Sequence, residues 1–246
     1  MMMAAGRSRL PELETAPKFI PLIETVTLIS LVVAVLALCL FAWIAQSVSQ
    51  QQAQSFDLSV RALIHQYASP HMTKAMVAVS FLGEGGLAFS CILAFGAFTK
   101  LRWRRATLWL VIAIVGALIL NFTLKYAFHR LRPTPFFEPP LSTYSFPSGH
   151  ALFSFCLYGV IAGLWADRVR SLPVRMTIWV VAALLVGTVG LSRIYLGVHY
   201  PSDVIAGYLA ATIWVCTLIA LDRMRTRRKT ARHRTRLASS DYTSET

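Results

Sequence analysis

Six apolar runs of membrane-spanning length divide this chain of 246 residues, and they constrain its fold more than any other feature. A hydrocarbon core about 30 Å thick requires roughly 20 apolar residues for each helical crossing. Five of the runs are uninterrupted and cover residues 26–48, 106–124, 151–166, 176–191 and 204–221. In the second run, Glu84 and the two glycines after it break the pattern. We place that span at 81–98 and expect 56–79 to form a connector along the membrane interface.

The composition and the residue pattern predict helices in a bilayer. Hydrophobic residues make up 56% of the chain and charged residues 14%, and the mean hydropathy is +0.57, a balance outside that of soluble domains. The runs do not alternate as barrel strands do, and a helix satisfies its own backbone hydrogen bonds in lipid. We therefore predict an all-α polytopic membrane protein with six transmembrane helices in one domain, residues 1–222. A basic tail, residues 223–246, is predicted to be disordered.

The basic residues are divided unequally between the two sides of a six-span chain. Most of the 24 Lys and Arg residues precede the first run, join the second to the third and the fourth to the fifth, or follow the sixth. The positive-inside rule makes that side cytoplasmic, so we expect both termini in the cytoplasm and the protein in the cell (inner or plasma) membrane. The first run is too long for the apolar core of a signal peptide and is expected to remain as an anchor. Attraction to anionic lipid is sufficient to explain the basic tail. We therefore expect no nucleic-acid partner.

A smaller set of basic residues falls on the opposite, outer side: Arg61, Lys74, Lys125, Arg130, Arg132 and Arg193. Four of these cluster at the ends of the third and fifth runs, beside YSFPSGHALFSF at 144–155, where a polar turn leads into an apolar helix. Cationic side chains that converge with a helix amino terminus bind phosphate, because free backbone N–H groups and the helix dipole favour an anion. Ser148 and Gly149 stand where those N–H groups would be. The turn therefore predicts an anion site on the outer end of the fourth span.

Two histidines add chemistry that binding alone does not require. His199 lies just before Pro201, which suits the first position of a helix, and Asp203 falls in the first turn that follows. A carboxylate four residues away can hold one imidazole nitrogen and leave the other free as a nucleophile. His150 is then a candidate proton donor for the leaving oxygen. The pattern predicts phosphoryl transfer with two histidines.

Three stretches in this region have a fixed order and internal spacing: KYAFHRLRP at 125–133, PSGH at 147–150 and SRIYLGVHYPSD at 192–203. They match the three-part signature of the type 2 phosphatidic acid phosphatase (PAP2) superfamily, which the chain therefore resembles. That signature is K, six residues, RP; then PSGH; then SR, five residues, H, three residues, D. The match covers about a third of the chain, and the six-helix topology extends the resemblance over most of the rest.

The resemblance implies a phosphohistidine on His199, oriented by Asp203, with His150 as the general acid. It implies that five further residues hold the phosphoryl oxygens: Lys125, Arg132, Ser148, Gly149 and Arg193. It also implies that no metal and no other cofactor is needed, in agreement with the lack of a motif such as H-E-x-x-H, since Arg and Lys can supply the charge of a metal ion. Arg130 and Glu84 are left outside the site. Vanadium haloperoxidases have a related arrangement of residues, but those enzymes are soluble.

Three classes of function remain open. The first is a phosphatase that removes the terminal phosphate of phosphatidic acid, phosphatidylglycerophosphate or a polyprenyl diphosphate such as undecaprenyl diphosphate at the outer leaflet. The second is a phosphotransferase that uses the same intermediate, with another lipid or a sugar in place of water. The third is a non-catalytic transporter or scaffold that binds anions. The expected partners are a lipid phosphate and the bilayer, and the motifs decide neither the lipid nor the oligomeric state.

Overall fold

The computed structural model describes residues 19–139 and 142–244, and within these ranges every regular element is a helix. The elements are α1 (Phe19–Ser49), α2 (Gln54–His65), α3 (Pro70–Phe81), α4 (Gly85–Lys100), α5 (Arg104–Phe128), α6 (Gly149–Ser154), the π-helical η1 (Phe155–Gly159), α7 (Val160–Ala166), α8 (Leu172–Tyr195) and α9 (Pro201–Ser244). Six helical segments are long and apolar enough to cross a membrane: Thr25–Ser49, Pro70–Lys100, Arg104–Phe128, Gly149–Ala166, Leu172–Tyr195 and Pro201–Arg227. The all-α membrane fold with six spans is confirmed.

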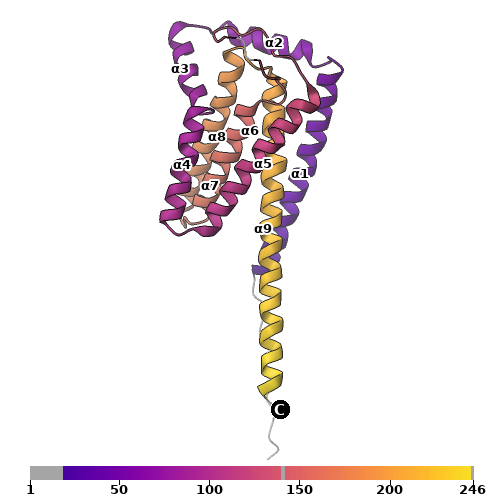
Figure 1. Ribbon diagram of the computed structural model, residues 1–246, viewed down its shortest axis with the longest axis vertical. Coiled ribbons are helices and arrows are strands. Elements are labelled where there is room, and N and C mark those ends of the chain that lie inside the picture. The colour runs from indigo at the N-terminus through magenta and orange to yellow at the C-terminus, as the bar shows by residue number, and fades with distance from the viewer. Residues whose placement is uncertain (1–18, 140–141, 245–246) are drawn as a thin grey trace, which may run out of the picture.

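The second span begins earlier than the sequence predicted. We placed residues 70–79 in an interfacial connector, whereas the structure has them in α3, which continues into α4 as one segment, Pro70–Lys100. The start of α3 has an ordinary cause, because the Ser69 side chain accepts a hydrogen bond from the Met72 N–H at 3.3 Å and Pro70 occupies the first turn. The predicted connector is therefore shorter, and its helical part is α2, which lies across the end of the bundle (Figure 1).

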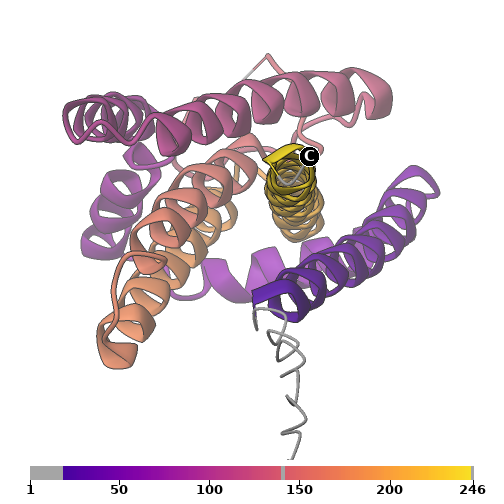
Figure 2. The same ribbon diagram turned by 90° about the horizontal axis from the view of Figure 1, so that it is seen from below.

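The helices pack around α9. Seen along the bundle, α9 lies between α1, α5 and the α6–α7 segment (Figure 2). Phe41 and Ile44 of α1 share a buried cluster with Leu152 of α6 and Ala206 of α9, and the Trp214 indole N–H donates to the Ala113 carbonyl of α5 at 3.0 Å. Large apolar side chains on the outside of the bundle remain exposed, as expected for a surface that faces lipid.

The last helix extends beyond the predicted domain. We expected disorder from residue 223 onward, but α9 continues as a helix to Ser244 (Figure 1). Residues 208–244 contain no Gly or Pro, and a helix that is already anchored is extended readily by Arg, Lys, Ala and Leu. Arg105 at the start of α5 also holds this region, because it contacts Asp222 at 2.6 Å and Thr226 at 2.9 Å.

The predicted site residues gather at one end of the bundle. That end is formed by α2, the last turns of α5 and α8, and the first turns of α6 and α9, and it is opposite the end at which α1 begins and α9 finishes (Figure 1). The loop from 129 to 148 also lies there, apart from residues 140 and 141, which are outside the described residues.

Candidate active site

His199 lies in the short turn between α8 and α9, and Asp203 lies in the first turn of α9. Gly197 has a φ of +80°, which suits the sharp turn that ends α8, and Pro201 begins α9. Nδ1 of His199 is 3.3 Å from Oδ2 of Asp203, which also accepts a hydrogen bond from the Tyr200 N–H at 2.9 Å. Both side chains are buried, with 1% and 0% exposed. The carboxylate thus holds the Nδ1–H of His199 and leaves Nε2 with a lone pair.

Nε2 of His199 faces the guanidinium group of Arg132. Nη1 of Arg132 is 3.0 Å from Nε2, and Nε and Nη2 donate to the carbonyl and hydroxyl oxygens of Thr143 at 2.8 and 2.9 Å. Burial, followed by the charges of Arg132 and Lys125, lowers the pKa of His199 well below its ordinary value, so the ring is neutral at physiological pH. Burial and the neighbouring Arg193 lower the pKa of Arg132 to about 10, which leaves it cationic.

The PSGH turn places the start of α6 against the start of α9. The Ser148 N–H donates to the Asp203 carbonyl at 2.9 Å. We had expected this N–H to be free to bind an anion, and the structure shows that it is not. The Ser148 hydroxyl oxygen, however, is buried and has no hydrogen-bond partner among the described residues. The Leu152 N–H donates to the Ser148 carbonyl at 3.1 Å. Gly149 is the first residue of α6, so its N–H is one of those for which a helix start supplies no intrahelical acceptor. A Cβ at Gly149 would lie 3.2 Å from Oδ1 of Asn121, so glycine allows close packing here.

Lys125 and Arg193 add two positive charges from different helices. Lys125, near the end of α5, is 9% exposed, and its ammonium group donates to the Tyr144 carbonyl. Arg193, near the end of α8, is 3% exposed, donates to the Ser80 hydroxyl and lies 3.6 Å from the Glu138 carboxylate. Its Nε atom is buried and has no hydrogen-bond partner in the described part of the chain.

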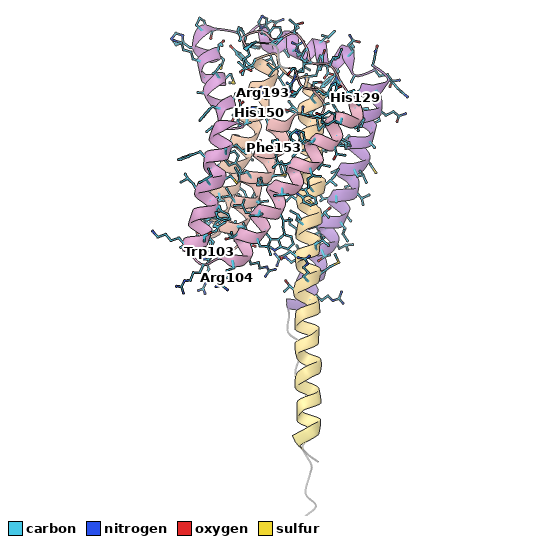
Figure 3. All side chains as sticks on the ribbon, in the orientation of Figure 1. Trp103, Arg104, His129, His150, Phe153 and Arg193 are labelled. Carbon is cyan, nitrogen blue, oxygen red and sulfur yellow. The ribbon has the colours of Figure 1, made fainter. Side chains whose placement is uncertain are left out.

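His150 occupies the first turn of α6, and Figure 3 shows it near Arg193 toward the same end of the bundle. The imidazole interacts electrostatically with Arg193 and with His199. Its Nε2 atom is buried and without a hydrogen-bond partner among residues 19–139 and 142–244, and the nearest carboxylate oxygen of Glu84 is 3.9 Å away. Gly83 packs against the ring, because a Cβ there would lie 2.6 Å from Cδ2 of His150.

Asp57 in α2 is a buried acid that the sequence analysis missed. Its carboxylate is 2.7 Å from Arg130, and Arg130 is 2.6 Å from the Asp203 carboxylate. Arg130 is therefore directed at the residue that holds His199. No motif spacing indicates Asp57, since it lies 73 residues before Arg130 and the two meet only when α2 folds across the bundle.

Several polar atoms of the predicted site are buried without hydrogen-bond partners in the described part of the chain. Ser148 Oγ, His150 Nε2 and Arg193 Nε are each unpaired within the described residues. Buried polar groups are normally hydrogen-bonded, so unpaired groups beside Lys125, Arg132 and Arg193 are suited to an anionic ligand. Guanidinium and ammonium groups suit phosphoryl oxygens, and the neutral imidazole offers a lone pair beside them. The arrangement can bind a phosphoryl group and accept it on Nε2 of His199.

Comparison with known proteins gives a consistent assignment. Residues 106–227 match the PAP2 superfamily. The chain is 30% identical over 174 residues to phosphatidylglycerophosphatase B of Bacillus subtilis, a match that covers 68% of this chain and 84% of that protein. It is 36% identical over 123 residues to undecaprenyl-diphosphatase of Sulfolobus acidocaldarius, with 48% and 55% of the two chains covered. The crystal structure of a transmembrane PAP2 type phosphatidylglycerolphosphate phosphatase from Bacillus subtilis has the same fold, with a TM-score of 0.71 and 24% identity over 78% of this chain and 96% of that one.

The chain therefore belongs to the PAP2 superfamily, as its three sequence motifs predicted. This assignment confirms the predicted enzyme class, a lipid phosphatase in a multi-pass membrane protein.

Proposed function

We propose that this protein hydrolyses the terminal phosphate of a lipid phosphate or lipid diphosphate, with His199 as the nucleophile. The observation that carries the proposal is the position of the His199 ring between Asp203 and Arg132. Nδ1 is 3.3 Å from the carboxylate and Nε2 is 3.0 Å from the guanidinium group. One partner fixes the tautomer, and the other supplies a positive charge beside the nitrogen that would attack phosphorus.

The first step transfers the phosphoryl group to the enzyme. Nε2 of His199 forms a bond to phosphorus while the bond between phosphorus and the leaving oxygen breaks. His150 enters this step as the imidazolium, a form that the negative charge of the bound phosphoryl group stabilises. It gives one proton to the leaving oxygen and becomes neutral, so the leaving group departs as an alcohol or, from a diphosphate, as a lipid monophosphate. Lys125, Arg132 and Arg193 stabilise the charge on the phosphoryl oxygens, and the Asp203 carboxylate stabilises the positive charge on the phosphorylated imidazole.

The second step regenerates the enzyme. Water attacks phosphorus, the bond between phosphorus and Nε2 breaks, and neutral His150 accepts a proton from that water. Inorganic phosphate is released, and His199 returns to its neutral form with Nδ1–H bonded to Asp203. The same intermediate would transfer phosphate to another hydroxyl group if one replaced water, which is the phosphotransferase alternative.

We place the active site at the outer face of the cell membrane, because the basic residues of the loops and of the end of α9 concentrate at the opposite end of the bundle, where α1 begins and α9 finishes. The names of the two relatives suggest phosphatidylglycerophosphate and undecaprenyl diphosphate as the first substrates to test. Phosphatidic acid carries the same terminal phosphoryl group and completes the panel.

The test is phosphate release by the purified protein in detergent on these three lipids. His199→Ala should lower the rate by at least about a thousandfold, as loss of a nucleophile does in other covalent mechanisms. His71→Ala is the matched control, because His71 is an exposed histidine in α3. Wild-type rates in His199→Ala, with every lipid, would contradict the proposal.

A second measurement separates hydrolysis from transfer. With substrate labelled in its terminal phosphate and candidate lipid or sugar acceptors present, hydrolysis predicts label only in inorganic phosphate. Label in an acceptor would establish the phosphotransferase instead.

A further inference from the structure

Asp57 is fully buried between α2 and the first turn of α9. Its Oδ1 atom accepts a hydrogen bond from the Ser202 N–H at 2.9 Å, and Oδ2 accepts from the Ser202 hydroxyl at 2.6 Å and from Nη2 of Arg130 at 2.7 Å. The side chain is 0% exposed. A carboxylate taken entirely out of water is tolerated only where hydrogen bonds and an opposite charge replace its hydration, and both are present here.

Arg130 joins Asp57 to the residue that orients the nucleophile. Its Nη1 atom donates to Oδ1 of Asp203 at 2.6 Å and to the Ser202 hydroxyl at 2.8 Å. The guanidinium carbon lies 4.1 Å from the centre of the Tyr200 ring, which covers one face of the group. The other oxygen of Asp203 faces His199. An unbroken chain of charged contacts therefore runs from α2 to the imidazole.

Asp57, Arg130 and Asp203 together carry one net negative charge, and it lies on the Nδ1 side of His199, away from Arg132. Arg130 neutralises one carboxylate, and the second remains uncompensated by it. Burial opposes the charge on Arg130, but Asp203 and Asp57 outweigh it and raise the pKa of Arg130 above its ordinary value. The net negative charge stabilises an imidazole that becomes positive when phosphorus bonds to Nε2. The effect is stronger because Asp57, Asp203 and His199 are buried away from water.

We propose that Asp57 is a positioning residue for the nucleophile: through Arg130 it fixes the Asp203 carboxylate and keeps a negative charge beside phosphorylated His199. Asp57 acts through other residues and does not touch the substrate. The inference rests on the proposed function, since it assigns Asp57 a part in forming the phosphohistidine.

Asp57→Asn tests the charge with little change of shape, because the amide can still accept a hydrogen bond from the Ser202 N–H. We expect kcat to fall on the order of ten- to a hundredfold, the range found for outer-shell carboxylates that orient a ligating imidazole, while KM changes much less. Asp57→Glu keeps the charge and should recover part of the lost rate. The full-length protein is assayed with the lipid that the wild type hydrolyses fastest.

Arg61→Lys is the control for the anchoring of α2. Arg61 holds the same helix by donating to the Thr134 and Gly197 carbonyls at 2.8 and 3.2 Å, and lysine retains the charge. A kcat close to that of the wild type in Arg61→Lys, with a reduced kcat in Asp57→Asn, supports the proposal. An equal loss in both variants would overturn it, because Asp57 would then act only by holding α2.

A double variant tests the route through Arg130. If Asp57 acts through Arg130, the variant with Asp57→Asn and Arg130→Gln should be no slower than Arg130→Gln alone, since coupled residues are not additive. Independent, multiplied losses would overturn the route.

A measurement without turnover separates this inference from the proposed function. The ring resonances of His199 in 15N-histidine protein, assigned with His199→Gln, should shift in Asp57→Asn and remain in place in Arg61→Lys. Unchanged resonances in Asp57→Asn overturn the positioning role. A wild type that hydrolyses no lipid phosphate while these shifts appear contradicts the proposed function instead.

Discussion

Arg132 and His199 are in direct contact, with Nη1 of the arginine 3.0 Å from Nε2 of the histidine. The nitrogen that would attack phosphorus thus already has a guanidinium N–H on its lone pair. A phosphoryl group entering the site would take over this N–H through one of its oxygens and so arrive beside the nucleophile. One arginine can therefore both disfavour protonation of His199 and position the substrate beside it.

Arg132→Lys should lower kcat/KM on the order of a hundredfold, the effect of removing one positioned donor to a developing oxyanion. Lysine keeps the charge but cannot donate to Thr143 and face Nε2 at the same time, as the guanidinium group does. Phosphate release by the purified variant measures the effect. Arg170→Lys, at an exposed position at the other end of the bundle, should behave as the wild type. Equal rates in both variants would contradict a role for the guanidinium fork.

His199 should titrate below the ordinary pKa of a histidine. Burial and the charges of Arg132 and Lys125 disfavour the protonated ring, so neutral His199 persists as the pH falls through 6.5 and is lost only at lower pH. A 15N-histidine NMR titration of the free protein, with His199→Gln for assignment, measures the midpoint directly. A midpoint at or above 6.5 would mean that Asp203 outweighs burial and the cations.

Gly83→Ala should lower kcat because the new methyl group would displace His150. An added Cβ would lie 2.6 Å from Cδ2 of His150 and 2.7 Å from Cγ1 of Val189, distances too short for either neighbour to remain in place. We expect a loss on the order of tenfold or more, since small displacements of a proton donor reduce its efficiency strongly. Gly96→Ala is the matched control, because nothing lies within 4 Å of a Cβ there. A normal rate in Gly83→Ala would show that His150 tolerates movement or is not the acid.

The sequence predicted the parts of the site that depend on local spacing. His199 and Asp203 are four residues apart across a helix start, so their contact follows from the geometry of one turn. The six spans follow from the length of the apolar runs. Hydropathy failed at α3 because Glu84 and its glycines interrupt the apolar pattern, although the helical segment continues through them. A boundary set by Ser69 and Pro70 carries no hydropathy signal.

Contacts between segments that are far apart in the chain could not be predicted from the sequence. Asp57 meets Arg130 because α2 lies across the bundle, and no residue pattern in α2 gives that position. The backbone of Ser148 is a similar case. Its N–H is used by the Asp203 carbonyl, a contact that depends on how α6 and α9 pack. The motif therefore identified Ser148 but not which of its groups is free to bind an anion.

Activity should persist when divalent metal ions are removed. Lys125, Arg132 and Arg193 supply positive charge from three separate segments, and this charge can stabilise the phosphoryl oxygens in place of a metal ion. Phosphate release should therefore be the same, within error, before and after dialysis against EDTA. Loss of activity that returns on addition of magnesium would contradict this expectation.

Glu138→Gln should strengthen the binding of phosphate-like anions. The Glu138 carboxylate lies 3.6 Å from the Arg193 guanidinium group. In the free protein it therefore partly neutralises a positive charge that we expect to stabilise the phosphoryl group. The negative charge of the carboxylate repels a second anion that binds beside Arg193. Glutamine removes this charge with little change in size. We expect the inhibition constant of vanadate, a phosphate analogue, to fall several-fold, in the direction that favourable electrostatic complementarity gives. Asp167→Asn, which removes an exposed carboxylate at the opposite end of the bundle, is the control and should leave vanadate inhibition unchanged. Weaker inhibition in Glu138→Gln would show the reverse role, in which Glu138 holds Arg193 in position for the phosphoryl oxygens.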